Sequence, residues 1–280
     1  MYLFADTMPR KIENIDYHVT DRCNLNCVSC GHFSCLVPPT VGHKPLETIQ
    51  KDLEILSCYA DCFVGLTLTG GECTLHPQLD EILHIARQYF PYNEITMYTN
   101  GTRAESMDKY KTAIHENNIN VLGTYYPLVG DKFWDIPSKI DGTLNYRLNA
   151  EHFHKVFFSG NECTDDEEIY TCASRGACCQ LVDGKLYPCQ YAAQFKYFDE
   201  YFKGRHKLKV EGDEYIDLTA KPFKTDVVEF MYTAKFDLCK HCLDAKRNAG
   251  HYFNDTEWRQ TEKKLDEWYI EEYKEETTQE

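Results

Sequence analysis

Apolar residues along the first 126 positions follow two periodicities. Short apolar runs, typical of buried strands, are separated by segments whose apolar residues recur every three or four positions, as in amphipathic helices. The runs predict strands at residues 17–20, 63–69, 94–99 and 119–126, and the periodic segments predict helices at 45–59, 77–89 and 106–116. This alternation indicates parallel strands with helical crossovers, so the carboxyl ends of the strands share one edge of the sheet.

The pattern is weaker beyond residue 127. Residues 143–148 and 155–158 are predicted as a fifth and a sixth strand, and residues 181–188 as a hairpin that turns at Asp183-Gly184. An apolar stripe from Thr256 to Tyr273 predicts an amphipathic helix in an acidic tail. The expected fold class is α/β, a partial (β/α)6 TIM-like barrel with a small C-terminal α+β domain. Its expected segments are an extension at 1–16, a core at 17–165, a second domain at 166–250 and the tail helix at 251–280.

Composition and charge exclude several classes of protein. The 280 residues are 42% apolar and 14% aromatic, which suits a folded domain with a packed core. No apolar run reaches the roughly 18 residues of a membrane span, and the N-terminus lacks a secretion signal, so we expect a cytoplasmic protein without a membrane partner. With 30 basic against 45 acidic residues, the net charge of -15 also disfavours nucleic acid as a partner.

Cysteine is the most informative residue type, with 14 in the chain. Without an export signal, clustered cysteines more often bind metal or perform redox chemistry than form disulfides. Cys23, Cys27 and Cys30 form a C-x3-C-x2-C loop directly after the first predicted strand. Three close thiolates can hold three irons of a cubane cluster and leave the fourth iron open to substrate or cosubstrate. Zinc is the alternative, although structural zinc sites have four ligands, usually in two close pairs.

This loop resembles the cluster motif of the radical S-adenosylmethionine (SAM) enzymes, and three later strand ends match that superfamily in order. Thr69-Gly70-Gly71-Glu72 resembles its GGE motif, and Thr99-Asn100-Gly101 closes the third strand, as is common there. The fourth strand ends at Thr124-Tyr125-Tyr126, where family members contact the ribose and methionyl parts of SAM. The resemblance covers about residues 15–160. It departs from the family at Ser29, where an aromatic residue usually precedes the third cysteine.

The resemblance implies a [4Fe–4S] cluster on the three loop cysteines and SAM bound at the open iron. Reductive cleavage of SAM would give a 5′-deoxyadenosyl radical that abstracts hydrogen from the substrate, with a flavodoxin- or ferredoxin-type protein as electron donor. The glycines leave room for SAM because they lack Cβ, and Glu72 can accept hydrogens of its ammonium group. The implied cofactor-binding residues are Gly70, Gly71, Glu72, Asn100 and Tyr125.

A second set of cysteines lies in the C-terminal part. Cys172-x11-Gly184-x4-Cys189, followed by Cys239-Lys240-His241-Cys242, resembles the SPASM/twitch extension of radical SAM enzymes. No cysteine follows Cys242, which matches the twitch form, and the resemblance implies one auxiliary [4Fe–4S] cluster. Cys178 or Cys179 could replace Cys172 as the first ligand, and a zinc site on the same cysteines is the alternative reading.

The resulting hypothesis is a radical SAM enzyme of oxidoreductase or epimerase type that acts on a small polar substrate such as a carbohydrate. The auxiliary cluster would accept an electron from the substrate radical. Arg147, His152 and Tyr126 are the candidate catalytic side chains. The alternatives are a peptide- or protein-modifying maturase and a non-enzymatic iron–sulfur or zinc-binding module. Maturases usually carry a leader-recognition domain, for which the residues before the first predicted strand leave no room.

Overall fold

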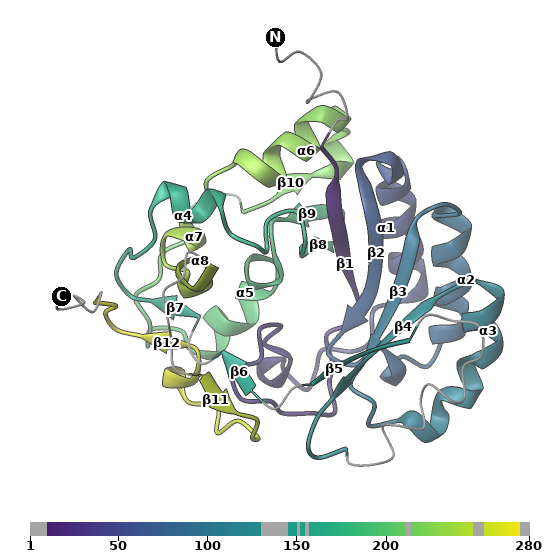
Figure 1. Ribbon diagram of the computed structural model, residues 1–280, viewed down its shortest axis with the longest axis horizontal. Coiled ribbons are helices and arrows are strands. Elements are labelled where there is room, and N and C mark those ends of the chain that lie inside the picture. The colour runs from purple at the N-terminus through teal and green to yellow at the C-terminus, as the bar shows by residue number, and fades with distance from the viewer. Residues whose placement is uncertain are drawn as a thin grey trace, which may run out of the picture.

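Eight strands form one open sheet in the order β10-β9-β8-β1-β2-β3-β4-β5 (Figure 1). The computed structural model describes residues 10–129, 145–149, 152–154, 157–210, 214–248 and 255–274. The strands of the sheet are β1 (Ile12–Thr20), β2 (Phe63–Gly70), β3 (Glu94–Thr99), β4 (Asn120–Tyr125), β5 (Asn145–Asn149), β8 (Cys179–Val182), β9 (Lys185–Tyr187) and β10 (Ile216–Asp217).

The six strands from β8 to β5 are mutually parallel, while β9 and β10 are antiparallel additions at one edge. Helices α1 (Leu46–Ser57), α2 (Leu79–Tyr89) and α3 (Lys111–Glu116) follow β1, β2 and β3 and cover the outer face of the sheet (Figure 1). The sheet is curved but not closed, because its edge strands β10 and β5 are not paired with each other. The predicted α/β fold with a partial, TIM-like barrel is confirmed.

The sixth parallel strand is not where the sequence places it. Phe158, at the end of the predicted strand 155–158, lies in β7 (Phe158–Ser159), which pairs with β12 (Tyr269–Ile270) outside the main sheet. The strand that takes the sixth place is β8, and it pairs with β1 instead of β5. It continues into β9 through Asp183 and Gly184, both at positive φ, so the predicted hairpin turn is confirmed.

The two faces of the parallel sheet differ in polarity. Alternate residues of β1, β2 and β3 point toward the helices and are fully buried in the main core, among them Ile15, Tyr17, Leu66, Leu68, Ile95 and Met97. The residues between them face the inside of the curve and are polar: Asn14, Asp16 and His18 on β1, Thr67 and Thr69 on β2, and Thr96 and Tyr98 on β3. Closed TIM barrels fill their interior with branched apolar side chains. The inner face of this sheet is polar instead.

The C-terminal elements lie across the hollow of the sheet from the outer helices (Figure 1). One exception is α6 (Lys224–Thr233), which packs against the main core through Val227 and Met231. The others are β6 (His152–His154), α4 (Asp166–Tyr170), α5 (Gln190–Tyr201), α7 (Asp237–Lys240), α8 (Leu243–Asn248) and β11 (Asp255–Glu257), together with β7 and β12. Their core is aromatic and includes Phe33 from the cysteine loop, Phe158, Tyr191, Phe198 and Trp268. None of the described helices is long and apolar enough to cross a membrane.

The predicted tail helix over Thr256–Tyr273 is wrong. This stretch contains β11, a 3-10 turn at Leu265–Glu267 and β12, joined by extended chain. Its apolar residues have helical spacing, but each inserts between elements that are distant in sequence. Trp268 is fully buried in the aromatic core, and Trp258 reaches the cysteine loop. Contacts with other parts of the chain therefore override the local helical pattern.

Candidate functional site

Cys23, Cys27 and Cys30 lie in the loop that leaves the carboxyl end of β1. All fourteen cysteines of the chain are free, so no disulfide ties this loop. Ser29 and Phe33, on either side of Cys30, have φ values of 49° and 50°, in the left-handed region that non-glycine residues seldom adopt. The loop is thus wound tightly around the third cysteine.

N–H groups point at the sulfur atoms of the loop. The backbone N–H of Leu25 donates to Cys23 Sγ at 3.4 Å, and the Asn100 side chain donates to the same sulfur at 3.7 Å. The indole N–H of Trp258 donates to Cys27 Sγ at 3.2 Å. Donors of this kind stabilise negative charge on sulfur, so the surroundings suit thiolates that ligate a metal.

Burial raises the pKa of all three thiols, to about 12 for Cys27. The charges of the neighbouring loop cysteines raise the pKa of Cys23 and of Cys27 further, so the sulfurs lie close together. At neutral pH such thiols keep their protons unless a metal cation replaces them. Among the described residues, no three Cys, His, Asp or Glu side chains are placed to share a single ion. In a cubane each thiolate binds its own iron, and the donor set of the loop fits that group.

The two glycines at the end of β2 press against the backbone of the cysteine loop. A Cβ on Gly70 would lie 2.1 Å from the Thr20 carbonyl oxygen, and one on Gly71 would lie 2.3 Å from that of Arg22. The Gly71 N–H donates to the Thr20 oxygen at 3.0 Å. The missing Cβ atoms were expected to make room for SAM, whereas the space beside Gly70 and Gly71 is filled by the chain's own loop.

Glu72 is buried, and its carboxylate is occupied by donors from the protein. Oε1 accepts from the backbone N–H of Thr74 at 3.1 Å and from the Thr99 hydroxyl at 2.8 Å, and Oε2 accepts from the backbone N–H of Asn100 at 2.6 Å. Burial raises the pKa of Glu72, while these hydrogen bonds oppose the rise. The side chain therefore joins the end of β2 to the end of β3, a role that differs from the expected contact with an ammonium group.

Asn100 links the end of β3 to the cysteine loop. Its Nδ2 donates to Asn24 Oδ1 at 3.0 Å in addition to Cys23 Sγ, and its Oδ1 accepts from the backbone N–H of Thr102 at 3.0 Å. Glu72 and Asn100 together hold three strand ends in one arrangement. The structure thus brings the motifs predicted from the sequence to one place.

Tyr126, just after β4, lies beside the loop cysteines. Burial raises the pKa of its phenol well above the usual value, and the charges of Cys27, Cys30 and Cys23 raise it further. Its ring meets that of Trp258 edge to face, with 6.2 Å between centroids. Tyr125 instead packs partly against the main core.

The other two candidate catalytic residues are placed only through their backbones. Arg147 lies in β5 opposite Gly123 of β4, and His152 lies in β6 opposite Glu257 of β11. Their side chains lie outside the described part of the structure, so both roles stay predictions.

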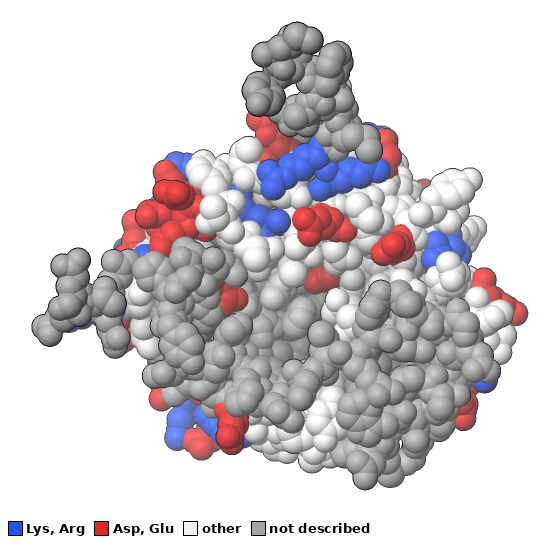
Figure 2. Space-filling view, in the orientation of Figure 1, with Lys and Arg blue, Asp and Glu red and all other residues white. Residues whose placement is uncertain are grey.

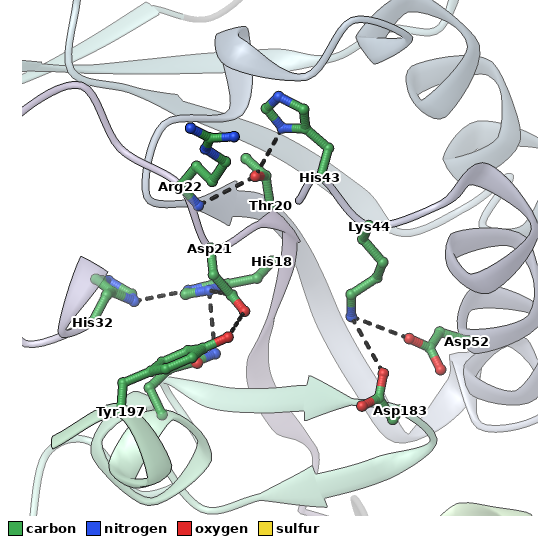
Figure 3. A network of polar contacts seen from close by, with 11 residues as sticks. His18, Thr20, Asp21, Arg22, His32, His43, Lys44, Asp52, Asp183 and Tyr197 are labelled. Atoms are coloured by element: carbon green, nitrogen blue, oxygen red, sulfur yellow. Dashed lines mark hydrogen bonds and ion pairs between the residues drawn. The ribbon is translucent and has the colours of Figure 1, made fainter. Parts of the chain in front are cut away.

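A buried polar network supports the base of the cysteine loop (Figure 3). His18 Nδ1 lies 2.8 Å from Asp21 Oδ1, His18 Nε2 lies 2.9 Å from His32 Nδ1, and the Tyr197 hydroxyl of α5 donates to Asp21 at 2.5 Å. Burial, with the charge of His18, lowers the pKa of His32 to about 3, so this ring is neutral. His32, which follows Cys30 by two residues, therefore helps to pack the loop against α5 through His18.

Residues 258–268, here called the C-terminal strap, cross the cysteine loop and bind it. The Val28 N–H donates to the Arg259 carbonyl oxygen at 2.9 Å, and the Thr261 N–H donates to that of Asn26 at 2.8 Å. The Trp268 indole donates to the Cys30 carbonyl oxygen at 3.1 Å. Sequence reasoning missed this strap because its tryptophans follow a helical spacing.

Ser29 is explained by the strap. Its hydroxyl is buried and donates to the Glu267 carbonyl oxygen at 2.6 Å. A small polar side chain is therefore used to bind the strap at the position before the third cysteine.

Four of the C-terminal cysteines line one small cavity: Cys172, Cys189, Cys239 and Cys242. Cys178 and Cys179 are not among its lining residues. Cys179 is fully buried in the main core as part of β8, and the charge of Asp16 helps to raise the pKa of Cys178. The geometry therefore gathers the set that contains Cys172, and that set has the four thiols that a closed cubane requires, whereas the described side chains are not placed to share one zinc ion.

Arg175 brings a cation to this second cavity. Its guanidinium is buried and donates from Nη2 to the Ala234 carbonyl oxygen at 2.5 Å, while Nε and Nη1 have no hydrogen-bond partner among the described residues. A buried cation is costly unless an anion balances it. Four thiolates around iron would supply that anion, so the buried guanidinium beside these thiols supports the fit of an iron–sulfur cluster. Sequence reasoning missed Arg175, for which the only signal is its place three residues after Cys172.

Comparison with known proteins identifies part of the chain. The profile of the radical SAM superfamily matches residues 17–123. AlbA, the antilisterial bacteriocin subtilosin biosynthesis protein of Bacillus subtilis (strain 168), is 33% identical over 98 residues, which are 34% of this chain and 20% of AlbA. A probable GTP 3',8-cyclase of Methanocella arvoryzae is 22% identical over 223 residues, which are 76% of this chain and 68% of that protein.

Among solved structures, BtrN in complex with AdoMet and 2-DOIA has a similar fold. The TM-score is 0.56 at 18% sequence identity, and the match covers 84% of this chain and 94% of BtrN. The aligned part of the chain thus spans a fifth of AlbA but nearly all of BtrN.

Proposed function

Residues 17–123 form a radical SAM superfamily domain, and on this premise we propose that the chain uses SAM to abstract hydrogen from a small polar substrate. The superfamily uses a [4Fe–4S] cluster together with SAM. The observation that carries the proposal is the loop at the end of β1, where three free thiols lie under N–H donors from Leu25, Asn100 and Trp258. This arrangement suits three iron ligands with one cluster corner left to SAM.

The cofactors supply the difficult chemistry, a one-electron cleavage of SAM that yields a hydrogen-abstracting radical. The protein's own residues hold and shield the site. Cys23, Cys27 and Cys30 ligate the cluster, and Asn100 and Glu72 keep the strand ends fixed around it. Tyr126 and Trp258 form an aromatic wall beside the loop, which limits the access of water to a radical reaction.

A second [4Fe–4S] cluster on Cys172, Cys189, Cys239 and Cys242 completes the proposal. Four thiol ligands leave no open iron, which suits a cluster that accepts an electron from the substrate. Arg175, with unpartnered N–H groups at the same cavity, balances the negative charge of such a centre. The C-terminal region would thus serve as a twitch-like domain.

The polar inner face of the sheet supports a small polar substrate. Asn14, Asp16, Thr67 and Tyr98 offer hydrogen-bonding groups where a packed barrel would have apolar ones. Figure 2 shows one row of basic side chains on the visible face, with acidic side chains beside it. Peptide or protein modification remains the second candidate, since AlbA is among the relatives.

The test is anaerobic purification with iron and sulfide analysis, followed by reduction with dithionite in the presence of SAM. We expect formation of 5′-deoxyadenosine by the wild-type protein and none by Cys27→Ala. Cys58→Ala is the matched control, because Cys58 is exposed and distant in sequence from both cysteine sets. SAM cleavage by Cys27→Ala, or no cleavage by iron-loaded wild type, would overturn the proposal in favour of a metal-binding module.

Incubation with deuterated sugars, cyclitols and peptides then separates the two substrate classes. Deuterium that appears in 5′-deoxyadenosine identifies the molecule from which hydrogen was taken. Transfer from a peptide, with none from the small molecules, would replace the small polar substrate by the maturase alternative.

A further inference from the structure

One level of the polar inner face is built from residues in direct register on three neighbouring strands. Asp16 of β1 pairs with Thr67 of β2 on one side and with Gln180 of β8 on the other. Residues paired in a parallel ladder point to the same face of the sheet. Asp16, Thr67 and Gln180 therefore share the inner face, one strand level below His18.

Asp16 is oriented by its neighbours but not neutralised by them. The Thr67 hydroxyl donates to Asn14 Oδ1 at 3.0 Å, which turns the Asn14 amide so that its Nδ2 donates to Asp16 Oδ1 at 2.7 Å. Among the described residues, no lysine, arginine or histidine forms an ion pair with Asp16. Burial raises the pKa of Asp16 to about 7, and the hydrogen bond from Asn14 opposes the rise. A carboxylate has about four acceptor positions, so acceptor positions on Asp16 are left for another donor.

Gln180 is the second unusual group of this level. Its side chain is fully buried, and neither Oε1 nor Nε2 has a hydrogen-bond partner in the part of the chain that the structure describes. A buried amide without partners costs about 1–3 kcal/mol, so native proteins seldom retain one without a reason. A ligand that accepts from Nε2 or donates to Oε1 would supply that reason.

The level above is different, because its polar groups are already satisfied. His18 is bonded at both ring nitrogens, to Asp21 and to His32. Tyr98 on the inner face of β3 borders the unsatisfied level and is 37% exposed, and burial together with the charge of Asp16 raises the pKa of its phenol. Asp16 itself is half-buried, so part of its surface reaches solvent.

The unsatisfied level lies between the two cysteine sites. Asp16 is four residues before the end of β1, or roughly 13 Å along the strand from Thr20, where the cysteine loop begins. On its other side, Asp16 is paired with Gln180 of β8, which follows Cys172 by eight residues. A small molecule that rests on Asp16 would thus lie between the two cysteine sets.

We propose that Asp16, oriented by Asn14, and Gln180 form the binding floor for an amine-bearing small polar substrate, whose ammonium group pairs with the Asp16 carboxylate. Gln180 receives a hydroxyl or carbonyl group of the same molecule. The ammonium group supplies the charge that no described residue gives to Asp16, and the hydroxyl or carbonyl group satisfies the buried amide. The inference rests on the proposed function and specifies its substrate class as an amine-bearing polyol or an amino acid derivative.

The experiment uses matched pairs of probes that differ only by an amine in place of a hydroxyl, glucosamine with glucose and galactosamine with galactose. Binding to the iron-loaded protein with SAM is measured by saturation-transfer NMR and titration calorimetry. We expect the amines to bind at least about tenfold more tightly than their hydroxyl twins, in line with the strength of hydrogen bonds to charged groups. Equal binding within the pairs, or no binding by either member, would overturn the proposal.

Two variants locate the effect. Asp16→Asn keeps the shape of the side chain and should abolish the advantage of the amines, whereas Asp226→Asn, at an exposed position of α6, should keep it. Gln180→Leu should weaken binding and raise the melting temperature, because an unsatisfied buried amide is replaced by an apolar group. A purely structural Gln180 would lower the melting temperature instead, and an amine advantage that survives Asp16→Asn would contradict the proposed floor.

This experiment is separable from the test of the proposed function. Probe binding needs no chemistry, while cleavage of SAM by the wild-type protein without a probe depends on the cysteine loop alone. Cleavage without an amine preference rejects only the substrate class. An amine preference without cleavage rejects only the radical chemistry.

Discussion

The two cysteine sites are built on different physical principles. Around the cysteine loop, N–H donors from three separate segments point at individual sulfur atoms, and the side toward Tyr126 is formed by aromatic rings. At the second cavity, four thiols are enclosed by buried side chains and accompanied by the guanidinium of Arg175. The first site is stabilised through directed hydrogen bonds and the second through enclosure and one buried charge.

This difference is informative about the proposed roles. A cluster with an open iron must stay accessible to a cosubstrate, so it cannot be enclosed by side chains. Its reduction potential is then set by hydrogen-bond donors to its sulfur atoms. A cluster with four protein ligands can be buried, and a nearby cation then makes it easier to reduce. The contrast therefore matches a site that cleaves SAM and a site that accepts an electron.

The largest effect should come from removal of the second site. We expect Cys239→Ala/Cys242→Ala to lose about four of the roughly eight irons that two cubanes contain. The protein should still cleave SAM in the absence of substrate, because the cysteine loop remains intact. Iron analysis and the 5′-deoxyadenosine assay give the two readouts. Unchanged iron in the double variant would show that these thiols do not hold a cluster.

A second pair of variants sharpens the assignment of the fourth ligand. We expect Cys172→Ser to lose the iron of the second site and Cys178→Ser to retain it, because only Cys172 lines the cavity with the other three thiols. Iron content and the visible absorbance of the cluster report the difference. The opposite result would mean that Cys178 moves to the cavity when iron binds.

Much of the fold and of the first site could be predicted from the sequence because both depend on local patterns. Alternating apolar periods place β1 to β4 and their helices, and chain order alone brings the ends of β1, β2 and β3 to one edge. The motif predicts Gly70 and Glu72 as site residues, but it does not predict the groups that they contact. Their partners, the Thr20 carbonyl and the backbone of Asn100, belong to neighbouring strands, which no sequence spacing reveals.

The failures share one physical cause, which is packing between distant segments. The strand beside β1 is β8, more than 150 residues later in the chain, because the hairpin that carries it pairs with the free edge of β1. The C-terminal strap has the spacing of a helix, yet Trp258 and Trp268 gain more by contacting Cys27 and the aromatic core. Tertiary contacts of this kind override local propensity and are invisible in periodicity.

Arg175 offers a test of the charge that distinguishes the second site. We expect Arg175→Gln to lower the reduction potential of the second cluster by on the order of tens of millivolts, because loss of a nearby cation disfavours the added electron. Arg205→Gln is the matched control, since Arg205 is exposed on the Phe202 ring. Potentiometric titration followed by electron paramagnetic resonance separates the two clusters. A shift in the reduction potential of the first cluster alone would contradict the placement of Arg175 beside the second cluster.

The two tryptophans of the C-terminal strap give the smallest expected effect, which is a shift in the reduction potential of the first cluster. Trp258 donates to a sulfur, at 3.2 Å from Cys27 Sγ, whereas Trp268 donates to a carbonyl, at 3.1 Å from the Cys30 oxygen. Trp258→Phe keeps an aromatic ring but removes the donor, so the potential of the first cluster should fall by about ten to a few tens of millivolts with little change in stability.

Trp268→Phe is the matched control for this prediction, because it leaves every described donor to sulfur in place. It creates a cavity in the aromatic core and removes one of the two described donors to the Cys30 carbonyl, while the Phe33 N–H at 3.0 Å stays. We therefore expect unfolding to become easier by about 1–3 kcal/mol, mainly through the cavity. The potential of the first cluster should stay within error. If both variants shift the potential equally, the strap acts by holding the shape of the loop, and directed hydrogen bonds no longer distinguish the first site from the second.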